Sequence, residues 1–150
     1  MKISLTVNAK IQISKPATEV YEAIVNPEQM THYFISKATG PMEEGKTLLW
    51  QFPEFTDEYP VRVGKMQKNK LISFYWDTDG KEYLVEINLT PKGDTTIVSV
   101  TESIGTNDEA GIKWLKGNTE GWANFLACLK AWLEYGINLR KGAFGFYKKT

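Results

Sequence analysis

The sequence predicts an α+β fold in which an antiparallel sheet is covered by a long helix near the C-terminus. Two observations carry this prediction. Residues 47–103 read as consecutive strands separated by turn residues, and residues 118–137 repeat large apolar side chains at the i, i+3, i+4, i+7 spacing of one helical face. Because the chain before this helix consists almost wholly of strands, we expect the helix to lie across the sheet.

The first strand is predicted over residues 3–13, where apolar and polar side chains alternate without a break. Ser14 is expected to cap a short helix that follows this strand. A second short helix is expected to have Asn26 as its N-cap and Pro27 at its first position, and to run through about Tyr33. The predicted order is therefore one strand, two short helices and then the remaining strands.

The middle of the chain is predicted to form an antiparallel meander. Asp79-Gly80 suits a tight hairpin turn, and the segment Lys92–Asp94 marks a second turn. Pro53 and Pro60 flank an expected open loop. The expected strands span residues 47–52, 59–66, 71–77, 83–90 and 95–103.

The predicted C-terminal helix, residues 118–137, carries two tryptophans and a phenylalanine on one face, which makes that face very large. Glycine is a poor helix former, so Gly111, Gly117 and Gly121 indicate a loop or a broken turn before the helix. The segment reaches the helix through Asn107 and Asp108.

A basic and aromatic tail follows the helix, over residues 138–150. It could fold back as a lid on a pocket, contact a partner, or touch acidic lipid. A frayed terminus whose aromatic side chains rest on the nearest surface is the simpler interpretation. Exposed aromatic residues in this tail would favour a homodimer.

Size and charge limit the classes of function. A chain of 150 residues with zero formal net charge fits one domain over residues 1–150, and it offers no field that would attract a nucleic acid. No apolar run reaches the roughly 18 residues that span a bilayer, so no transmembrane segment is expected. The one cysteine, Cys128, and the lack of an apolar leader favour a cytoplasmic location.

Few residues are available for catalysis. His32 is the only histidine, which excludes metal sites and mechanisms that need several histidines from one chain. His32 could act as a general base, although a surface or capping role is simpler. Cys128 is expected to be a buried thiol with a raised pKa. No phosphate-binding loop or serine-hydrolase motif occurs, so we assign no catalytic residue, no metal site and no cofactor.

The order of the elements and several loose motifs resemble one known superfamily. The motifs are residues 16–23, residues 64–66 followed by the aromatic residues 74–76, residues 96–102, and Gly121-Trp122 near the start of the last helix. They resemble the START-like (SRPBCC) superfamily, and most closely the bacterial proteins grouped with the C-terminal domain of the heat shock protein 90 ATPase activator. The resemblance covers nearly the whole chain. It implies the helix-grip fold, a curved antiparallel sheet with two short helices after the first strand and a long C-terminal helix across it.

The resemblance also implies an apolar pocket between the long helix and the concave face of the sheet. Wide aromatic planes rarely fill space without gaps, and a gap would suit a flat or acyl ligand, whereas a filled core is an equal alternative. Among the expected contacts, Arg62 and Glu102 could pair or hold a carboxylate or hydroxyl, although solvent-facing positions are the simpler interpretation. The residues expected to contact a ligand are Trp50, Phe52, Arg62, Phe74, Trp76, Glu102, Trp122, Phe125, Leu129 and Trp132.

Three functions remain open. The first is noncatalytic binding of a small hydrophobic or aromatic ligand. The second is an enzyme resembling polyketide cyclases or dehydratases, which would need groups such as His32, Arg62 and Glu102 to converge on one point. The third is a protein-interaction module resembling the heat shock protein 90 ATPase activator domain. Because the resemblance covers only the C-terminal domain of that activator, a chaperone partner is doubtful.

Overall fold

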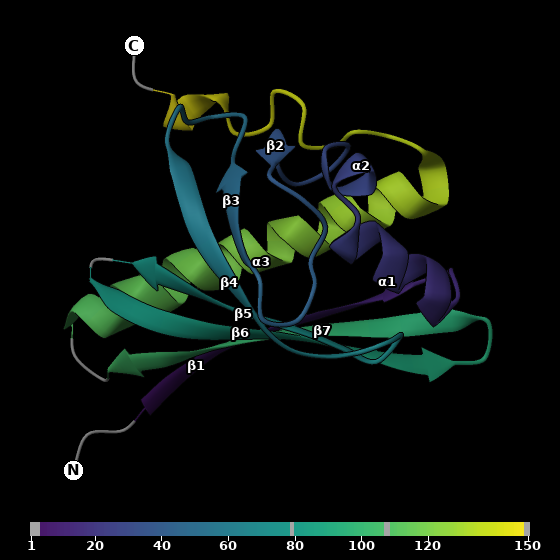
Figure 1. The fold of residues 1–150 in the computed structure, drawn as a ribbon, viewed down its shortest axis with the longest axis horizontal. Helices are drawn as coiled ribbons and strands as arrows, with labels where there is room; N and C mark the ends of the chain where they lie inside the picture. The colour runs from purple at the N-terminus through teal and green to yellow at the C-terminus, as the bar shows by residue number, and fades with distance from the viewer. Residues whose placement is uncertain (1–3, 79, 107–108, 149–150) are drawn as a thin grey trace.

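The computed structural model describes residues 4–78, 80–106 and 109–148. In chain order, the elements are β1 (Ser4–Ile13), α1 (Ala17–Val25), α2 (Pro27–Met30), β2 (Lys37–Ala38), β3 (Thr47–Gln51), β4 (Glu58–Gln67), β5 (Leu71–Thr78), β6 (Lys81–Lys92), β7 (Thr95–Thr106), α3 (Glu109–Tyr135) and the 3-10 helix η1 (Gly145–Tyr147). Within these residues, seven strands form one antiparallel sheet in the order β1-β7-β6-β5-β4-β3-β2. The predicted α+β architecture is confirmed, because α3 runs across the curved sheet (Figure 1).

The expected strands of the meander are confirmed, with ends that differ by a few residues. Gly93 has φ 60°, as the predicted turn between β6 and β7 requires. Of the other predicted turn, Asp79 lies outside the described residues. The short strand β2 was not predicted, because its two residues, which pair with Gln51 and Trp50, are too few to show an alternating pattern.

The two short helices are confirmed, but their ends differ from those predicted. Ser14 does not cap α1, because the residue before that helix is Pro16, and the Ser14 backbone N–H donates to Glu134 Oε2 at 3.0 Å. Asn26 does cap α2, accepting a hydrogen bond from the Glu28 backbone N–H at 3.0 Å. The helix ends at Met30 rather than about Tyr33, because the chain turns there.

The long helix α3 starts at Glu109, nine residues before the predicted start at residue 118. The expectation of a loop or broken turn at Gly111, Gly117 and Gly121 is therefore wrong. Each glycine costs a helix about 1 kcal/mol relative to alanine, and packing of the neighbouring turns against the sheet outweighs this cost. Trp114, for example, stacks on Tyr83 of β6 at 5.0 Å between ring centroids. Asn107 and Asp108, expected to lead into the helix, lie outside the described residues.

The core lies between α3 and the inner face of the sheet. Large apolar residues that alternate along the strands point into this core: Leu48 and Trp50 of β3, Phe74 of β5 and Val85 of β6 are all buried. The C-terminal half of α3 is tied to the end of β1, where Lys130 Nζ donates to the Gln12 carbonyl at 2.8 Å. Among the described residues, no helix is long and apolar enough to cross a membrane.

Candidate functional site

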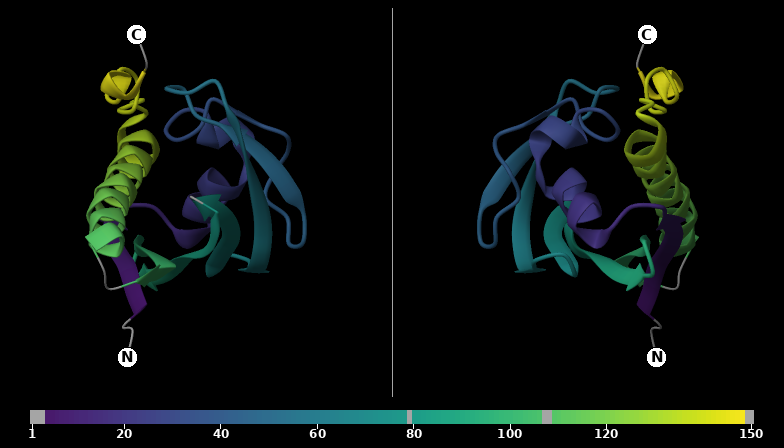
Figure 2. Two further views of the ribbon diagram at one scale, coloured as in Figure 1. Left: turned by 90° about the vertical axis from the view of Figure 1, so that its left-hand side faces the viewer. Right: turned by 90° about the vertical axis from the view of Figure 1, so that its right-hand side faces the viewer.

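A groove of about 550 Å³ opens between α3 and the part of the sheet formed by β4 and β5. Figure 2 shows α3 on one side of the molecule and the ribbons of β3 and β4 on the other. The loop between β3 and β4 and the tail after α3 close one end of the groove. The residues that line it are Phe34, Phe52, Glu54, Phe55, Tyr59, Pro60, Trp76, Asp77, Gly117, Asn118, Gly121, Trp122, Arg140 and Tyr147.

Two glycines of α3 keep the groove open. Gly117 and Gly121 are four residues apart, so they lie on the same face of the helix, and both line the groove. A Cβ atom built on either glycine meets no atom within 4 Å. The helix therefore presents bare backbone where side chains would otherwise fill the space between it and β4.

A buried carboxylate holds the floor of the groove in place. Glu102, on β7, is fully buried, and both of its oxygens accept hydrogen bonds. Trp76 Nε1 donates to one oxygen at 2.7 Å, whereas Asn118 Nδ2 and Trp122 Nε1 donate to the other at 2.6 and 3.0 Å. All three donors belong to residues that line the groove. Glu102 thus joins β5 and α3 directly beneath the surface of the groove.

An ion pair joins the β3–β4 loop to the tail at the end of the groove that these two segments close. Arg140 Nη2 and Glu54 Oε1 are 2.5 Å apart, with 14% and 5% of the side chains exposed. The Arg140 guanidinium carbon also lies 5.6 Å from the Phe52 ring centroid and 4.9 Å from that of Phe144. Burial raises the pKa of the nearby Cys128 thiol, which Arg140 lowers and Glu54 raises by smaller amounts, so the predicted raised pKa is confirmed.

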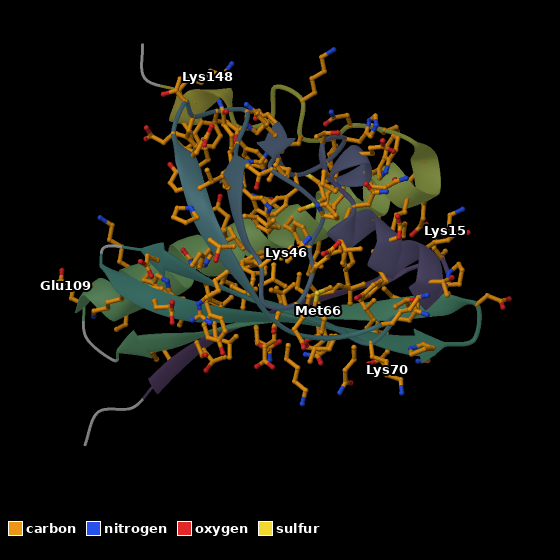
Figure 3. The ribbon with its side chains drawn as sticks, viewed as in Figure 1. Lys15, Lys46, Met66, Lys70, Glu109 and Lys148 are labelled. Carbon is orange, nitrogen blue, oxygen red and sulfur yellow. The ribbon has the colours of Figure 1, made fainter. Side chains whose placement is uncertain are left out.

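The tail returns to the sheet after α3. Its Tyr147 ring lies 6.3 Å from the Phe55 ring in the β3–β4 loop, and both residues line the groove. Figure 3 places Lys148 of the tail at the top of the molecule, above Lys70 of the β4–β5 turn. Together with Phe34, the Glu54–Arg140 pair also lines a smaller cavity of about 270 Å³ under the tail. The tail therefore forms a wall of the groove.

The structure divides the ligand contacts predicted from the sequence. Phe52, Trp76 and Trp122 line the groove, and Glu102 lies one layer deeper. Four other members of the set are packed in the core and do not line the groove. They are Trp50, Phe74, Phe125 and Leu129, each at most 3% exposed. The filled-core interpretation therefore describes this inner half of the helix–sheet interface, whereas the outer half is where the groove opens.

Arg62 does not meet Glu102. It lies on the outer face of β4, between the buried residues Val61 and Val63, where it pairs with Glu82 at 3.0 Å and packs over the Tyr75 ring at 4.1 Å. The expectation that Arg62 and Glu102 could share a cavity is wrong. Neighbouring residues of a strand point to opposite faces of the sheet, so Arg62 points away from the core that Val61 and Val63 enter. The position of Arg62 between two valines was a signal in the sequence that already excluded an inward-facing side chain.

His32 and Trp132 lie apart from the groove. Their rings stack at 4.1 Å between centroids, and Trp132 Nε1 donates to Gln29 Oε1 at 2.8 Å. Trp132 lines a separate depression beside α1 and α2. The convergence of His32, Arg62 and Glu102 that an enzyme would need is absent from the described structure. In the same part of the chain, no three His, Cys, Asp or Glu side chains gather as a metal site.

Sequence reasoning missed three kinds of groove residue. Tyr59 precedes Pro60, one of the two prolines that flank the expected open loop. An aromatic residue at the edge of that loop was a usable signal. Asn118 is four residues before Trp122 and therefore shares its helix face, which was a weaker signal. Arg140 had no usable signal, because its position depends on the path of the tail.

Comparisons with known proteins agree with this fold. A family model described as activator of Hsp90 ATPase homolog 1-like protein matches residues 14–134. The structure of protein SSP2350 from Staphylococcus saprophyticus is similar, with 30% identity, a TM-score of 0.81, and coverage of 91% of this chain and 96% of that one. No curated protein matches the chain.

More distant structures share the fold. The Aha1 dimer from Colwellia psychrerythraea has 20% identity and a TM-score of 0.75, over 88% of this chain and 98% of that one. DynU16, from the dynemicin biosynthetic locus, has 23% identity and a TM-score of 0.79, over 89% of this chain and 48% of that one. With the family match covering most of its length, the chain belongs to the activator of Hsp90 ATPase homolog 1-like family, within the START-like (SRPBCC) superfamily.

Proposed function

We propose that the chain binds a small, largely apolar ligand in the groove between α3 and the sheet, without catalysing a reaction. The open space beside Gly117 and Gly121 is the observation that carries this proposal. The volume of about 550 Å³ lies within the range of about 300–1,000 Å³ common for small-molecule sites. Seven of the fourteen lining residues are aromatic, and a few polar groups lie among them, as ligand sites usually require.

The arrangement of polar groups favours binding over catalysis. Glu102 is occupied by three hydrogen-bond donors, and the Tyr33 hydroxyl donates to the Ala23 carbonyl at 2.8 Å. Burial raises the pKa of Tyr33 well above its usual value, so this phenol is a poor acid near neutral pH. His32 lies outside the groove. Among Glu102, Tyr33 and His32, therefore, no acid–base pair is directed at one point of the groove.

Native mass spectrometry of the purified full chain tests the proposal. We expect a retained small molecule on the natural-sequence protein, and its loss from Gly121→Leu, which places an apolar side chain in the groove. Ala123→Leu is the matched control, because Ala123 is exposed on the same helix and does not line the groove. If both variants retain the molecule equally, it is bound somewhere else.

A second candidate function is self-association through the tail. Large apolar side chains are exposed at the end of α3 and along the tail, among them Tyr135 at 69% and Phe146 at 72%. Such side chains are typical of interfaces between protein chains. Sedimentation of the protein with Phe146→Ser and Tyr135→Ser would show a lower average mass than the unaltered chain if the segment mediates a dimer. An unaltered chain that sediments as a monomer at all concentrations would exclude this function.

A further inference from the structure

We propose that the groove prefers a cationic ligand, an ammonium group on an apolar body seated against Trp76 and Trp122. The proposal rests on the groove being a ligand site, and it adds the charge of the ligand. Three observations support it. They are a buried carboxylate behind the indole rings, the balance of charge around the groove, and the position of Arg140, which lies over aromatic rings beside a buried carboxylate at the tail end of the groove.

The carboxylate of Glu102 has donors around it but no cation. Its described partners are two indole N–H groups and one amide, all neutral. The ion pairs found among the described residues do not include Glu102. Because each of these partners donates and none accepts, the arrangement suits an ionised carboxylate. A buried carboxylate without a countercharge is unfavourable, and a cation bound in the groove would reduce that cost.

The two indole rings that bind this carboxylate also line the groove. The rings of Trp76 and Trp122 lie 5.7 Å apart at an angle of 34°, and both line the groove. The face of an indole ring is already negative, and tryptophan is the best aromatic partner for a cation. Donation from each indole N–H to the Glu102 carboxylate makes the ring more electron-rich. Trp76 is partly exposed and Trp122 is only 4% exposed, so Trp76 offers most of the surface on which an ammonium group would sit.

The charges around the groove favour the same ligand. Among the lining residues, Glu54 and Asp77 are acidic and Arg140 is basic. Arg140 is already paired with Glu54. With Glu102 behind the rings, the excess charge near Trp76 is negative, which would repel an anionic ligand and attract a cationic one.

At the tail end of the groove, a side chain of the protein supplies the cation beside the aromatic rings and the buried carboxylate. There, the Arg140 guanidinium lies over the rings of Phe52 and Phe144, beside the buried carboxylate of Glu54. The Trp76–Trp122 end has the rings and the buried carboxylate, and the described residues supply no cation to them. A ligand ammonium group would occupy the place that Arg140 takes at the other end.

Three probes with the same phenethyl body test the preference by calorimetric titration of the full chain. They are phenethyltrimethylammonium, the neutral dimethyl phenethyl carbinol, and the anionic phenylpropanoate. We expect the ammonium to bind about 5- to 30-fold more tightly than the carbinol, as a cation on aromatic rings predicts. Phenylpropanoate is expected to bind most weakly.

Variants then identify the source of the preference. Glu102→Gln is expected to lower the ammonium-to-carbinol affinity ratio several-fold, because it removes the buried negative charge and leaves the two rings in place. Glu82→Gln is the matched control, because Glu82 is an exposed carboxylate on the outer face, and it is expected to keep the ratio. Trp76→Phe retains a ring but removes one hydrogen bond to Glu102, and it is expected to lower the ratio about threefold. This variant decides the matter if Glu102→Gln does not fold.

The outcomes separate the two proposals. If the carbinol binds as tightly as the ammonium, or if the ratio survives both Glu102→Gln and Trp76→Phe, the cation preference is wrong and the groove remains a ligand site. If none of the three probes binds, both proposals fail.

Discussion

Arg140 Nη2 donates a hydrogen bond to Glu54 Oε1 at 2.5 Å, which ties the tail to the β3–β4 loop across 86 positions of the sequence. Both side chains are mostly buried. Removing one member of a buried ion pair leaves the other charged and unpaired, which is far more costly than losing an exposed pair. This contact therefore determines whether the groove has a wall at this end.

Arg140→Ala is expected to lower the free energy of unfolding by about 3 kcal/mol, because Glu54 would stay buried without its partner. Urea denaturation measures the change. Lys141→Ala is the control, since Lys141 is exposed, and its effect is expected to stay within about 0.5 kcal/mol. Adding Glu54→Gln to Arg140→Ala should recover part of the loss. Equal urea midpoints for Arg140→Ala and the unaltered protein would show that the pair does not hold the tail.

The two groove glycines give a prediction of opposite sign. Gly117→Ala and Gly121→Ala are each expected to raise the free energy of unfolding by about 0.5–1 kcal/mol, because alanine is the better helix former and its Cβ meets no neighbour. Thermal unfolding measures both variants. A lower melting temperature in either variant would mean that the space beside that glycine is already filled.

These glycines show where sequence reasoning about this chain succeeds and where it fails. Alternation along the strands and the i, i+3, i+4 spacing in α3 identified the inward faces, since burial imposes those periods directly. Local propensity, in contrast, predicted a loop or a broken turn at Gly117 and Gly121, before the main helix. Tertiary packing of Trp122 and its neighbours overrode that propensity.

The candidate site was harder to predict than the fold. Inward-facing residues such as Trp50 and Trp76 have the same pattern in the sequence, yet only Trp76 reaches the groove. The difference depends on how far α3 stands from each strand, which no local pattern records. Arg140 enters the site because the tail turns back after Gly136, which has φ 65°.

Glu134 gives a pH-dependent prediction. Hydrogen bonds from the Lys130 ammonium and the Ser14 backbone N–H hold the pKa of Glu134 below its usual value of 4.5. A carboxylate whose pKa is lower in the folded state than in the unfolded state stabilises the fold above its unfolded-state pKa. That contribution is lost as the pH falls through the folded-state pKa.

Glu134→Gln is therefore expected to be less stable than the unaltered protein at neutral pH, and to lose less stability between about pH 5 and pH 3. Urea midpoints across this range measure the slope. Glu120→Gln, at an exposed position of the same helix, is expected to keep the slope of the unaltered protein. Parallel pH profiles for Glu134→Gln and the unaltered protein would contradict the assigned role.

The groove itself is tested most directly by the indole N–H resonances of the five tryptophans in an NMR titration of the full chain. Dimethyl phenethyl carbinol, a neutral probe, is suitable because it does not depend on the charge preference. We expect it to shift the resonances of Trp76 and Trp122, which line the groove, and to leave that of Trp132, on the far depression, unchanged. A shift of Trp132 with no change at Trp76 and Trp122 would contradict a ligand site between α3 and the sheet.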